Sequence, residues 1–345
     1  MAFVGLAKNT GKTEAMVALI RELSSQGREL AITSIGRDGE EFDAIQPRIT
    51  KPPIRCPAGT LVATAAPLLR RSGAKHAVLA RTGVRTPLGE VQIVRLEQSA
   101  KIEVAGPSSS EQITAVVEEM LTLGADQAII DGSIDRRAAA APGVADAVIM
   151  ATGAVLAEDI EGVVSHTGRA VEMISLPEVT DERLRDLAEG ATGESVVAEG
   201  ESVRRLPSHF ALTAQAGQLP EGLRPSDGRE QTLVVSGVLP EHLLEALLPG
   251  RGQNQLRVVA PSPTNVFIHV HSPEWYRQRG VHLEVLDQVE LSALTVNPQA
   301  PLSHSFDSTS LRTTIADVVP HGLPVIDVKE PHYQEAWERS LATAG

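Results

Sequence analysis

The stretch GLAKNTGKT, residues 5–13, constrains the fold of this chain more than any other part of its sequence. Its pattern is G-x-x-x-x-x-G-K-T, one residue longer between the glycines than the usual G-x-x-x-x-G-K-[ST] loop, with Leu6 where that loop has its first glycine. Such a loop follows a strand and opens a helix. The apolar run at residues 2–4 is typical of a buried parallel strand. The stretch therefore predicts a loop that cradles phosphates, against the alternative of an ordinary glycine-containing turn before a helix.

The helix predicted after this loop has one apolar face. Met16, Leu19, Ile20 and Leu23 recur at positions i, i+3, i+4 and i+7, the spacing of residues that share one side of a helix. Gly27 follows at the position of a glycine that ends a helix. The strand–loop–helix context that the motif requires is therefore predicted on both sides of it.

Each part of the loop has an expected role in binding a nucleoside triphosphate. Gly5 and Gly11 let backbone N–H groups face the phosphates, and the helix start adds its partial positive charge. Lys12 is expected to reach the β- and γ-phosphates, and the Thr13 hydroxyl to bind Mg²⁺. Lys8 stays open between reaching a partner's nucleotide, contacting a phosphate bound to its own chain, and being solvated. The predicted nucleotide-binding residues of the loop are Gly5, Lys8, Asn9, Thr10, Gly11, Lys12 and Thr13.

Two acidic residues are candidates for holding Mg²⁺. Asp131 ends the apolar run AIID and precedes a glycine, which suits the magnesium-linked acid of a nucleotide hydrolase; a helix cap after the strand is the alternative. Asp38 lies in SIGRDGE, with Glu40 and Asp43 as substitutes and a polar turn as the alternative. The predicted metal ligands are Thr13, Asp38 and Asp131, and the predicted catalytic residues are Lys12, Asp38 and Asp131.

Asn297 and Pro298 directly follow a late apolar strand at residues 291–296. An asparagine amide matches the donor–acceptor pattern that adenine presents at N6 and N7, and the prolines around it would fix its position. The sequence has no N-K-x-D guanine motif. The stretch predicts ATP rather than GTP as the ligand, with Asn297 and Pro298 near the base; a proline-rich turn is the alternative.

Strand-like and helical runs alternate along the chain, which predicts an α/β fold with a mostly parallel sheet covered by helices on both faces. Residues 91–104 alternate in polarity and predict a β-hairpin. Residues 187–230 are rich in Gly, Glu, Ser and Pro and weak in periodicity, so they are expected to form an insert or a linker. The predicted divisions are a nucleotide-binding core at 1–186, this variable segment at 187–230, and a C-terminal α/β half at 231–345.

Composition excludes several other classes of protein. Hydrophobic residues make up 42% and charged residues 22%, a normal globular balance, and the net charge of −13 argues against nucleic-acid or membrane-surface binding. The single cysteine, Cys56, excludes a disulfide framework. No apolar stretch approaches the ~20 residues that span a membrane. Because the motif begins at residue 5, no room is expected for a signal peptide, and a cytoplasmic protein is predicted.

Five segments, in this order, carry a resemblance to a known family: FVGLAKNTGKT, TSIGRDGE, KPPI, IIDGSIDRRAAAAPGVADAVIMATGA and LTVNPQAPLSHSFD. They resemble the P-loop subunit of the ATP-dependent reactivating factor of lysine 5,6-aminomutase, an adenosylcobalamin enzyme of lysine fermentation. The similarity spans nearly the whole chain apart from residues 187–230. The loop and the late Asn-Pro pair also resemble dethiobiotin-synthetase-like P-loop proteins, which use ATP and are commonly dimeric.

The resemblance implies a dethiobiotin-synthetase-like P-loop core and a chaperone-like ATPase that uses ATP and Mg²⁺. It implies a homodimer that works beside a second ATPase subunit, expelling damaged cobalamin from the aminomutase so that fresh adenosylcobalamin can enter. Two other functions stay open. One is a small-molecule ATP-dependent ligase of dethiobiotin-synthetase type, with Lys51 as a candidate for the acceptor pocket. The other is a regulatory scaffold that binds nucleotide without turning it over.

Overall fold

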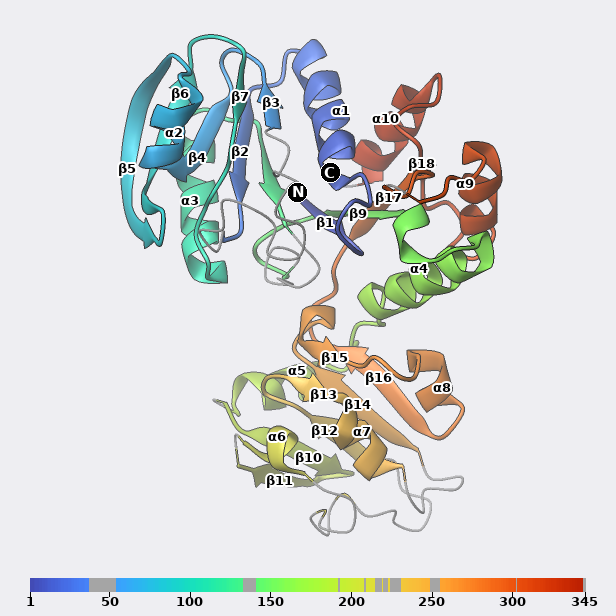
Figure 1. The fold of residues 1–345 in the computed structure, drawn as a ribbon. Coiled ribbons are helices and arrows are strands. Elements are labelled where there is room, and N and C mark those ends of the chain that lie inside the picture. The colour runs from blue at the N-terminus through green and yellow to red at the C-terminus, as the bar shows by residue number, and fades with distance from the viewer. Residues whose placement is uncertain are drawn as a thin grey trace. The chain divides into compact units, whose positions relative to one another are not determined.

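The computed structural model describes most of the chain and divides it into two compact units (Figure 1). The first unit combines Met1–Gly168 with Glu290–Gly345, and the second is Arg169–Val289. The residues described are 1–36, 54–132, 141–191, 193–207, 209–214, 219, 223, 231–248, 255–301 and 303–343.

The first unit is built on a mixed sheet that has nine strands within the described residues. Neighbours from β18 to β4 pair in parallel, and β6 pairs antiparallel with both β4 and β5. In sheet order the strands are β18 (Val325–Ile326), β17 (Leu291–Asn297), β9 (Val148–Gly153), β1 (Ala2–Gly5), β8 (Gln127–Asp131), β2 (Leu30–Ser34), β4 (Leu61–Ala65), β6 (Gly89–Leu96) and β5 (His76–Thr86).

The inner strands of this sheet are mostly apolar, and they are buried along most of their length. Every residue of β1 and β9 is buried, and only the end residues of β8 and β17 are partly exposed. Strands covered on both faces have this continuous apolar character rather than an alternating one. Among the described residues, the α-helices of the first unit are α1 (Lys12–Ser25), α2 (Ala66–Ser72), α3 (Ser110–Thr122), α9 (Ser308–Ala316) and α10 (Tyr333–Thr343). Helix α4 (Ile160–Ile174) begins in the first unit and includes the first residues of the second.

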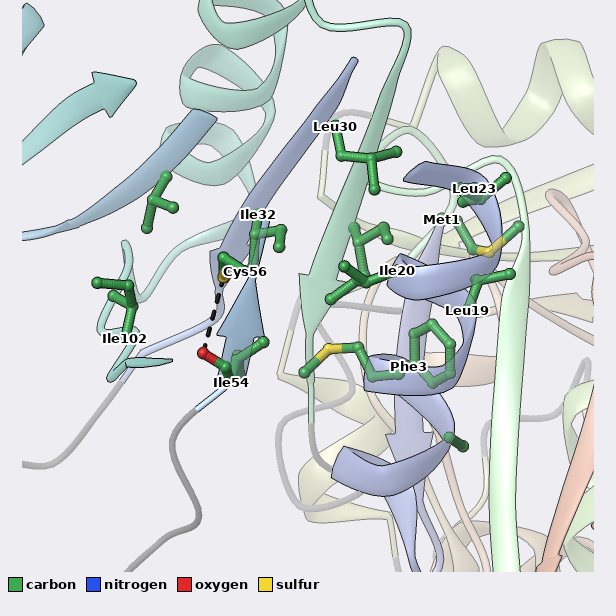
Figure 2. Close-up of a cluster of buried hydrophobic side chains, with 14 of the residues drawn as sticks. Met1, Phe3, Leu19, Ile20, Leu23, Leu30, Ile32, Ile54, Cys56 and Ile102 are labelled. Atoms are coloured by element: carbon green, nitrogen blue, oxygen red, sulfur yellow. Dashed lines mark hydrogen bonds between the residues drawn. The ribbon is translucent and has the colours of Figure 1, made fainter. Parts of the chain in front are cut away.

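Helix α1 has the apolar face that its spacing predicts. Met16, Leu19, Ile20 and Leu23 are all buried, and Gly27, with φ of 78°, lies just beyond the end of the helix. Figure 2 shows Leu19, Ile20 and Leu23 of α1 gathered with side chains of β1 and β2 in one apolar cluster, to which Met16 also belongs. This packing fixes the start of α1 against the central strands.

The hairpin predicted within residues 91–104 does not form there. Strand β6 takes the first part of that range and pairs with β4 and β5, whereas β7 (Ala100–Ile102) pairs with β3 (Ile54–Cys56) in a separate two-stranded sheet. The residues between β6 and β7 form a bend, so the alternation belongs to two short strands with different partners. The antiparallel hairpin of this region is instead β5–β6.

The second unit has its own mixed sheet of five strands within the described residues, in the order β11-β10-β12-β14-β16. Strand β10 pairs antiparallel with β11 and β12, and β12, β14 and β16 pair in parallel. The strands are β10 (Ser195–Glu199), β11 (Ser202–Leu206), β12 (Gln231–Val234), β14 (Leu256–Ala260) and β16 (Val281–Val285). The other elements are α5 (Glu182–Glu189), α6 (Phe210–Thr213), β13 (Leu239–Pro240), α7 (Glu241–Leu247), β15 (Val266–Phe267) and α8 (Pro273–Arg277).

These two units divide the chain differently from the boundaries expected at 186/187 and 230/231. Residues 187–230, expected to be an insert or a linker, contain β10 and β11 of the second sheet. Residues 290–345 belong with the start of the chain, because the buried strand β17 pairs with β9. Four of the five residues of β11 are exposed, which explains why its composition resembles a loop.

None of the helices in the part of the chain that the structure describes is both long and apolar enough to cross a membrane.

Candidate functional site

Neighbouring parallel strands bring the predicted site residues to one edge of the first sheet. Strand β1 lies between β8 and β9, and β17 lies beyond β9. The register places Gly5 opposite Ala151 and Asn297 opposite Gly153, and Asp131 is the last residue of β8. Because the carboxyl ends of parallel strands meet at one edge, the loop after Gly5 lies between Asp131 and Asn297, where ligands of open α/β sheets commonly bind.

The loop of residues 5–13, called the GKT loop below, folds back on itself. The Thr10 hydroxyl is buried and donates a hydrogen bond to the Ala7 carbonyl oxygen at 3.1 Å. A β-carbon at position 5 would lie only 2.8 Å from Thr10 Oγ1. Gly5 is therefore required by the close approach of the loop's own threonine.

Helix α1 begins from the GKT loop without a side-chain cap among the described residues. Gly11 precedes the helix in the left-handed conformation, with φ of 82°, and its carbonyl oxygen accepts the first helical hydrogen bond, from the Ala15 N–H at 3.0 Å. The first N–H groups of a helix have no partner within the helix, and the helix dipole makes this end partly positive. This end of α1 is therefore suited to receive an anion.

Lys12 and Asp131 form an ion pair between the GKT loop and the end of β8. The contact joins Lys12 Nζ to Asp131 Oδ1, and the two side chains are 19% and 17% exposed. The attraction between two opposite charges is stronger where water is largely excluded, and removing one partner leaves the other charge without compensation. The lysine and the acid that the sequence predicted as partners in binding are thus in direct contact.

Asn297 contacts the other side of the GKT loop. Its Nδ2 donates a hydrogen bond to the Asn9 carbonyl oxygen at 2.9 Å, and its Oδ1 accepts one from the Gln299 N–H at 3.2 Å. Pro298, also predicted near the base, follows directly, and its carbonyl oxygen accepts a hydrogen bond from the Phe306 N–H at 2.9 Å. Both residues therefore belong to a closed turn beside the loop.

Two other polar groups at this edge were not singled out from the sequence. Ser34, the last residue of β2 and opposite Asp131, is buried; its hydroxyl donates to the Val104 carbonyl and accepts from the Gly106 N–H. Thr152 of β9 shares a buried 2.6 Å hydrogen bond between hydroxyls with Thr167 of α4. The sequence signal that could have identified Ser34 and Thr152 is a polar residue near the end of an apolar strand. Their hydrogen-bond partners could not have been identified in this way, because they depend on the tertiary fold.

The remaining predicted residues are only partly accounted for. Lys8 is exposed and Thr13 lies in the first turn of α1 with intermediate exposure. Asp38, Glu40, Asp43 and Lys51 lie outside the described residues. Within the described ranges, no three His, Cys, Asp or Glu side chains form a group that could hold a metal ion.

The arrangement combines an uncapped helix start, a lysine and an acid in contact, and an asparagine that holds the intervening loop. Together these groups offer N–H donors and a cation to an anionic ligand and a carboxylate to a metal ion. No model of a known protein family, no curated protein and no solved structure matches the chain.

Proposed function

We propose that this chain is a P-loop ATPase that binds Mg·ATP at the GKT loop. The observation that carries the proposal is the contact between Lys12 and Asp131 beside the start of α1. Each of these residues has the type, position and neighbour that phosphoryl-transfer sites use: a lysine for the β- and γ-phosphates and a strand-end acid for the metal. The carboxyl-edge position of the loop supports the same reading.

The donors at this edge fit Mg²⁺ by their chemistry. Asp131 supplies a carboxylate and Thr13, two residues after Gly11, supplies a hydroxyl; both are the hard oxygen ligands that Mg²⁺ takes, together with phosphate oxygens and water. When bound, the metal ion would neutralise charge on the β- and γ-phosphates. The work of the chain is then to orient the phosphates with its backbone N–H groups and to supply the charge of Lys12.

A nucleotide would compete with Asp131 for Lys12. If Lys12 turns to the phosphates, the Asp131 carboxylate loses its partner, and a buried carboxylate without compensation is costly. A divalent cation would restore that compensation. The ion pair therefore supports a site in which nucleotide and metal bind better together than separately.

We further propose that the ATPase acts as a subunit of a reactivating factor, beside a second ATPase subunit, for an adenosylcobalamin-dependent lysine 5,6-aminomutase. The resemblance of the five sequence segments to the subunit of such a factor supports this role, and these segments include the GKT loop, the strand that ends at Asp131 and the turn at Asn297. The physical requirement is a switch between two shapes, which the γ-phosphate can supply by holding loops that relax after hydrolysis.

Reconstitution tests this function. The aminomutase is inactivated with hydroxocobalamin and mixed with this chain, the second ATPase subunit, Mg²⁺, adenosylcobalamin and ATP. Activity should return with wild type and with Lys101→Ala, which removes an exposed lysine of β7, but not with Lys12→Ala or with a non-hydrolysable ATP analogue. Stoichiometric ATP cleavage driven by an amine or carboxylate acceptor, without any reactivation, would favour a ligase instead.

A further inference from the structure

One side-chain hydrogen bond ties the middle of the GKT loop to a residue far away in the chain. Asn297 Nδ2 donates to the Asn9 carbonyl oxygen at 2.9 Å, across 288 residues of sequence. The orientation of the amide is fixed by its other contact, because Oδ1 accepts from the Gln299 N–H at 3.2 Å and only Nδ2 can donate to a carbonyl. The side chain therefore links β17 to the middle of the loop.

Two glycines make this link possible. A β-carbon at Gly11 would lie 3.0 Å from Asn297 Cβ, and one at Gly153 would lie 2.4 Å from the Asn297 carbonyl oxygen. Contacts this short require a shift of the neighbouring atoms, and the latter involves backbone. The glycine of the loop and the glycine that ends β9 thus leave the space that Asn297 fills.

In the part of the loop that Asn297 holds, Asn9 has a backbone conformation that carries a modest cost for any residue other than glycine. Asn9 has φ of 67° and Gly11 has φ of 82°, both in the left-handed region. A residue other than glycine adopts this region at a cost, and it persists where surrounding structure holds it. The hydrogen bond to the Asn9 carbonyl holds this turn from outside the loop. The loop is also tied to distant residues by the bond from the Leu6 N–H to the Ala151 carbonyl and by the Lys12–Asp131 pair.

We propose that Asn297 is a positioning residue that keeps the GKT loop in its phosphate-binding shape before the ligand arrives. The inference rests on the proposed function and deepens it, because it assigns to this residue the preparation of the phosphate site rather than recognition of the base alone. A loop that is ordered in advance loses less conformational freedom when it binds. Loss of Asn297 should therefore weaken binding of the polyphosphate part of the ligand.

Inorganic tripolyphosphate separates the two roles because it has no base. Calorimetric affinities for tripolyphosphate, ATP and GTP are compared between wild type, Asn297→Ala and the control Asn265→Ala. Asn265 is a matched control because it lies in the second unit and its Oδ1 also accepts a hydrogen bond, from the Ser262 hydroxyl. The proposal predicts that Asn297→Ala weakens all three ligands by the same factor, about tenfold, and that Asn265→Ala changes none. A loss confined to ATP, with tripolyphosphate unchanged, would assign Asn297 to the base and overturn the proposal.

Two further measurements separate positioning from a general loss of stability. In ATP hydrolysis, Asn297→Ala should raise KM about tenfold and leave kcat within about threefold. The reason is that a loop held in one shape throughout the reaction binds the substrate and the transition state equally well, so its loss weakens both by the same factor. Asn297→Asp keeps the size of the side chain and the acceptor for Gln299 but lacks the donor, so it should show the same loss for tripolyphosphate at high salt.

Hydrogen–deuterium exchange of the unliganded protein tests the link itself. Amides of residues 5–13 should exchange about tenfold faster in Asn297→Ala than in wild type, while peptides of the second unit stay unchanged. If the wild type binds tripolyphosphate but these amides exchange equally fast in wild type and Asn297→Ala, the positioning role alone would be overturned. A wild type that binds neither tripolyphosphate nor ATP would overturn the proposed function, and with it the role of Asn297 toward phosphate.

Discussion

Lys12 and Asp131 neutralise each other at the edge of the sheet, so each is prepared for a ligand of the opposite charge. Their side chains are 19% and 17% exposed, enough for a ligand to reach them and little enough for the pair to be well shielded from water. In the function proposed above, binding of a nucleotide would exchange one ion pair for two, Lys12 with phosphate and Asp131 with metal. At the scale of single residues, this exchange is the chemistry that we propose for the site.

Replacing Asp131 with Asn tests this exchange. Without the carboxylate, Lys12 is no longer held in the pair, so ATP without metal should bind Asp131→Asn at least as tightly as wild type. The gain in affinity that Mg²⁺ gives the wild type should fall below about twofold in the variant. Calorimetric titrations with and without Mg²⁺ measure both quantities. A variant whose response to Mg²⁺ equals that of wild type would move the metal-binding role to another residue, with Asp38 the first candidate.

At the scale of elements, the second unit has a carboxylate that locks a loop to the start of α7. Glu241 accepts backbone hydrogen bonds from His269, Val270 and His271 at 2.8–3.0 Å, and a further bond from the Tyr276 hydroxyl at 3.2 Å. Burial raises the pKa of Glu241, but the hydrogen bonds from these four donor groups outweigh the effect of burial, and the net pKa is lowered from 4.5. The ionised form is therefore the one that the fold holds.

The sign of the resulting pH dependence follows from this lowered pKa. A carboxyl group whose pKa is lower in the folded state stabilises the fold above its unfolded pKa of 4.5, and the contribution is lost as the pH falls through the folded pKa. Glu241→Gln should cost about 1–2 kcal/mol of unfolding free energy at neutral pH, because its amide group cannot accept all of these bonds. The difference from wild type should shrink below pH 4.5.

Tryptophan fluorescence can follow the second unit alone. The chain has two tryptophans, Trp275 in the second unit and Trp337 in the first, so a Trp337→Phe background leaves only Trp275 as a reporter. Urea unfolding of Glu241→Gln and its parent is then compared between about pH 3 and pH 7, so that the range extends well below the unfolded pKa of 4.5. An unfolding difference that does not change over this range would contradict the assigned role of the Glu241 carboxylate.

Residues with local signals were predicted well from the sequence. The spacing of Met16, Leu19, Ile20 and Leu23 predicted helix α1 and its buried face, and the apolar runs before Gly5 and Asp131 predicted β1 and β8. The α/β class is also confirmed. These features depend on periodicity and on side chains that are apolar over several consecutive residues, which a single sequence displays directly.

Pairing between distant segments could not be predicted in the same way. Strand β11 is mostly exposed, so its sequence lacks the apolar pattern of a buried strand. Within residues 91–104, the sequence does not indicate that the two strands pair with different partners. The hydrogen bond from Asn297 to Asn9 joins residues whose proximity depends on β17 pairing with β9. Asn297 was selected for its position after a strand, but the carbonyl that it binds follows only from the tertiary structure.

At the scale of the whole molecule, the last helix completes the core beneath the GKT loop. Trp337 of α10 is fully buried and meets Phe3 of β1 edge to face, with ring centroids 6.4 Å apart. Both belong to the apolar cluster that contains Cys56, the chain's single cysteine. The C-terminal segment therefore stabilises the strand from which the loop leaves.

Truncating Trp337 to Ala should destabilise the first unit by about 3–5 kcal/mol, the usual cost of removing a large buried aromatic side chain. Cys56 reports unfolding of the first unit. Burial raises the pKa of its thiol to about 12 and keeps the thiol unreactive while the core is folded. Pulsed thiol labelling across a urea gradient should show a lower midpoint for Trp337→Ala. Trp275→Ala, in the second unit, is the matched control and should leave the midpoint unchanged; equal shifts would mean that the two units unfold together.

The most direct test of the central claim, that the GKT loop binds Mg·ATP through Lys12, is equilibrium binding by calorimetry. Wild type should bind Mg·ATP at one site per chain. Lys12→Ala should bind at least about tenfold more weakly, because a charge-assisted contact with the phosphates is lost, whereas Lys101→Ala should match wild type. Absence of binding by wild type, or equal affinities for wild type and Lys12→Ala, would contradict the account.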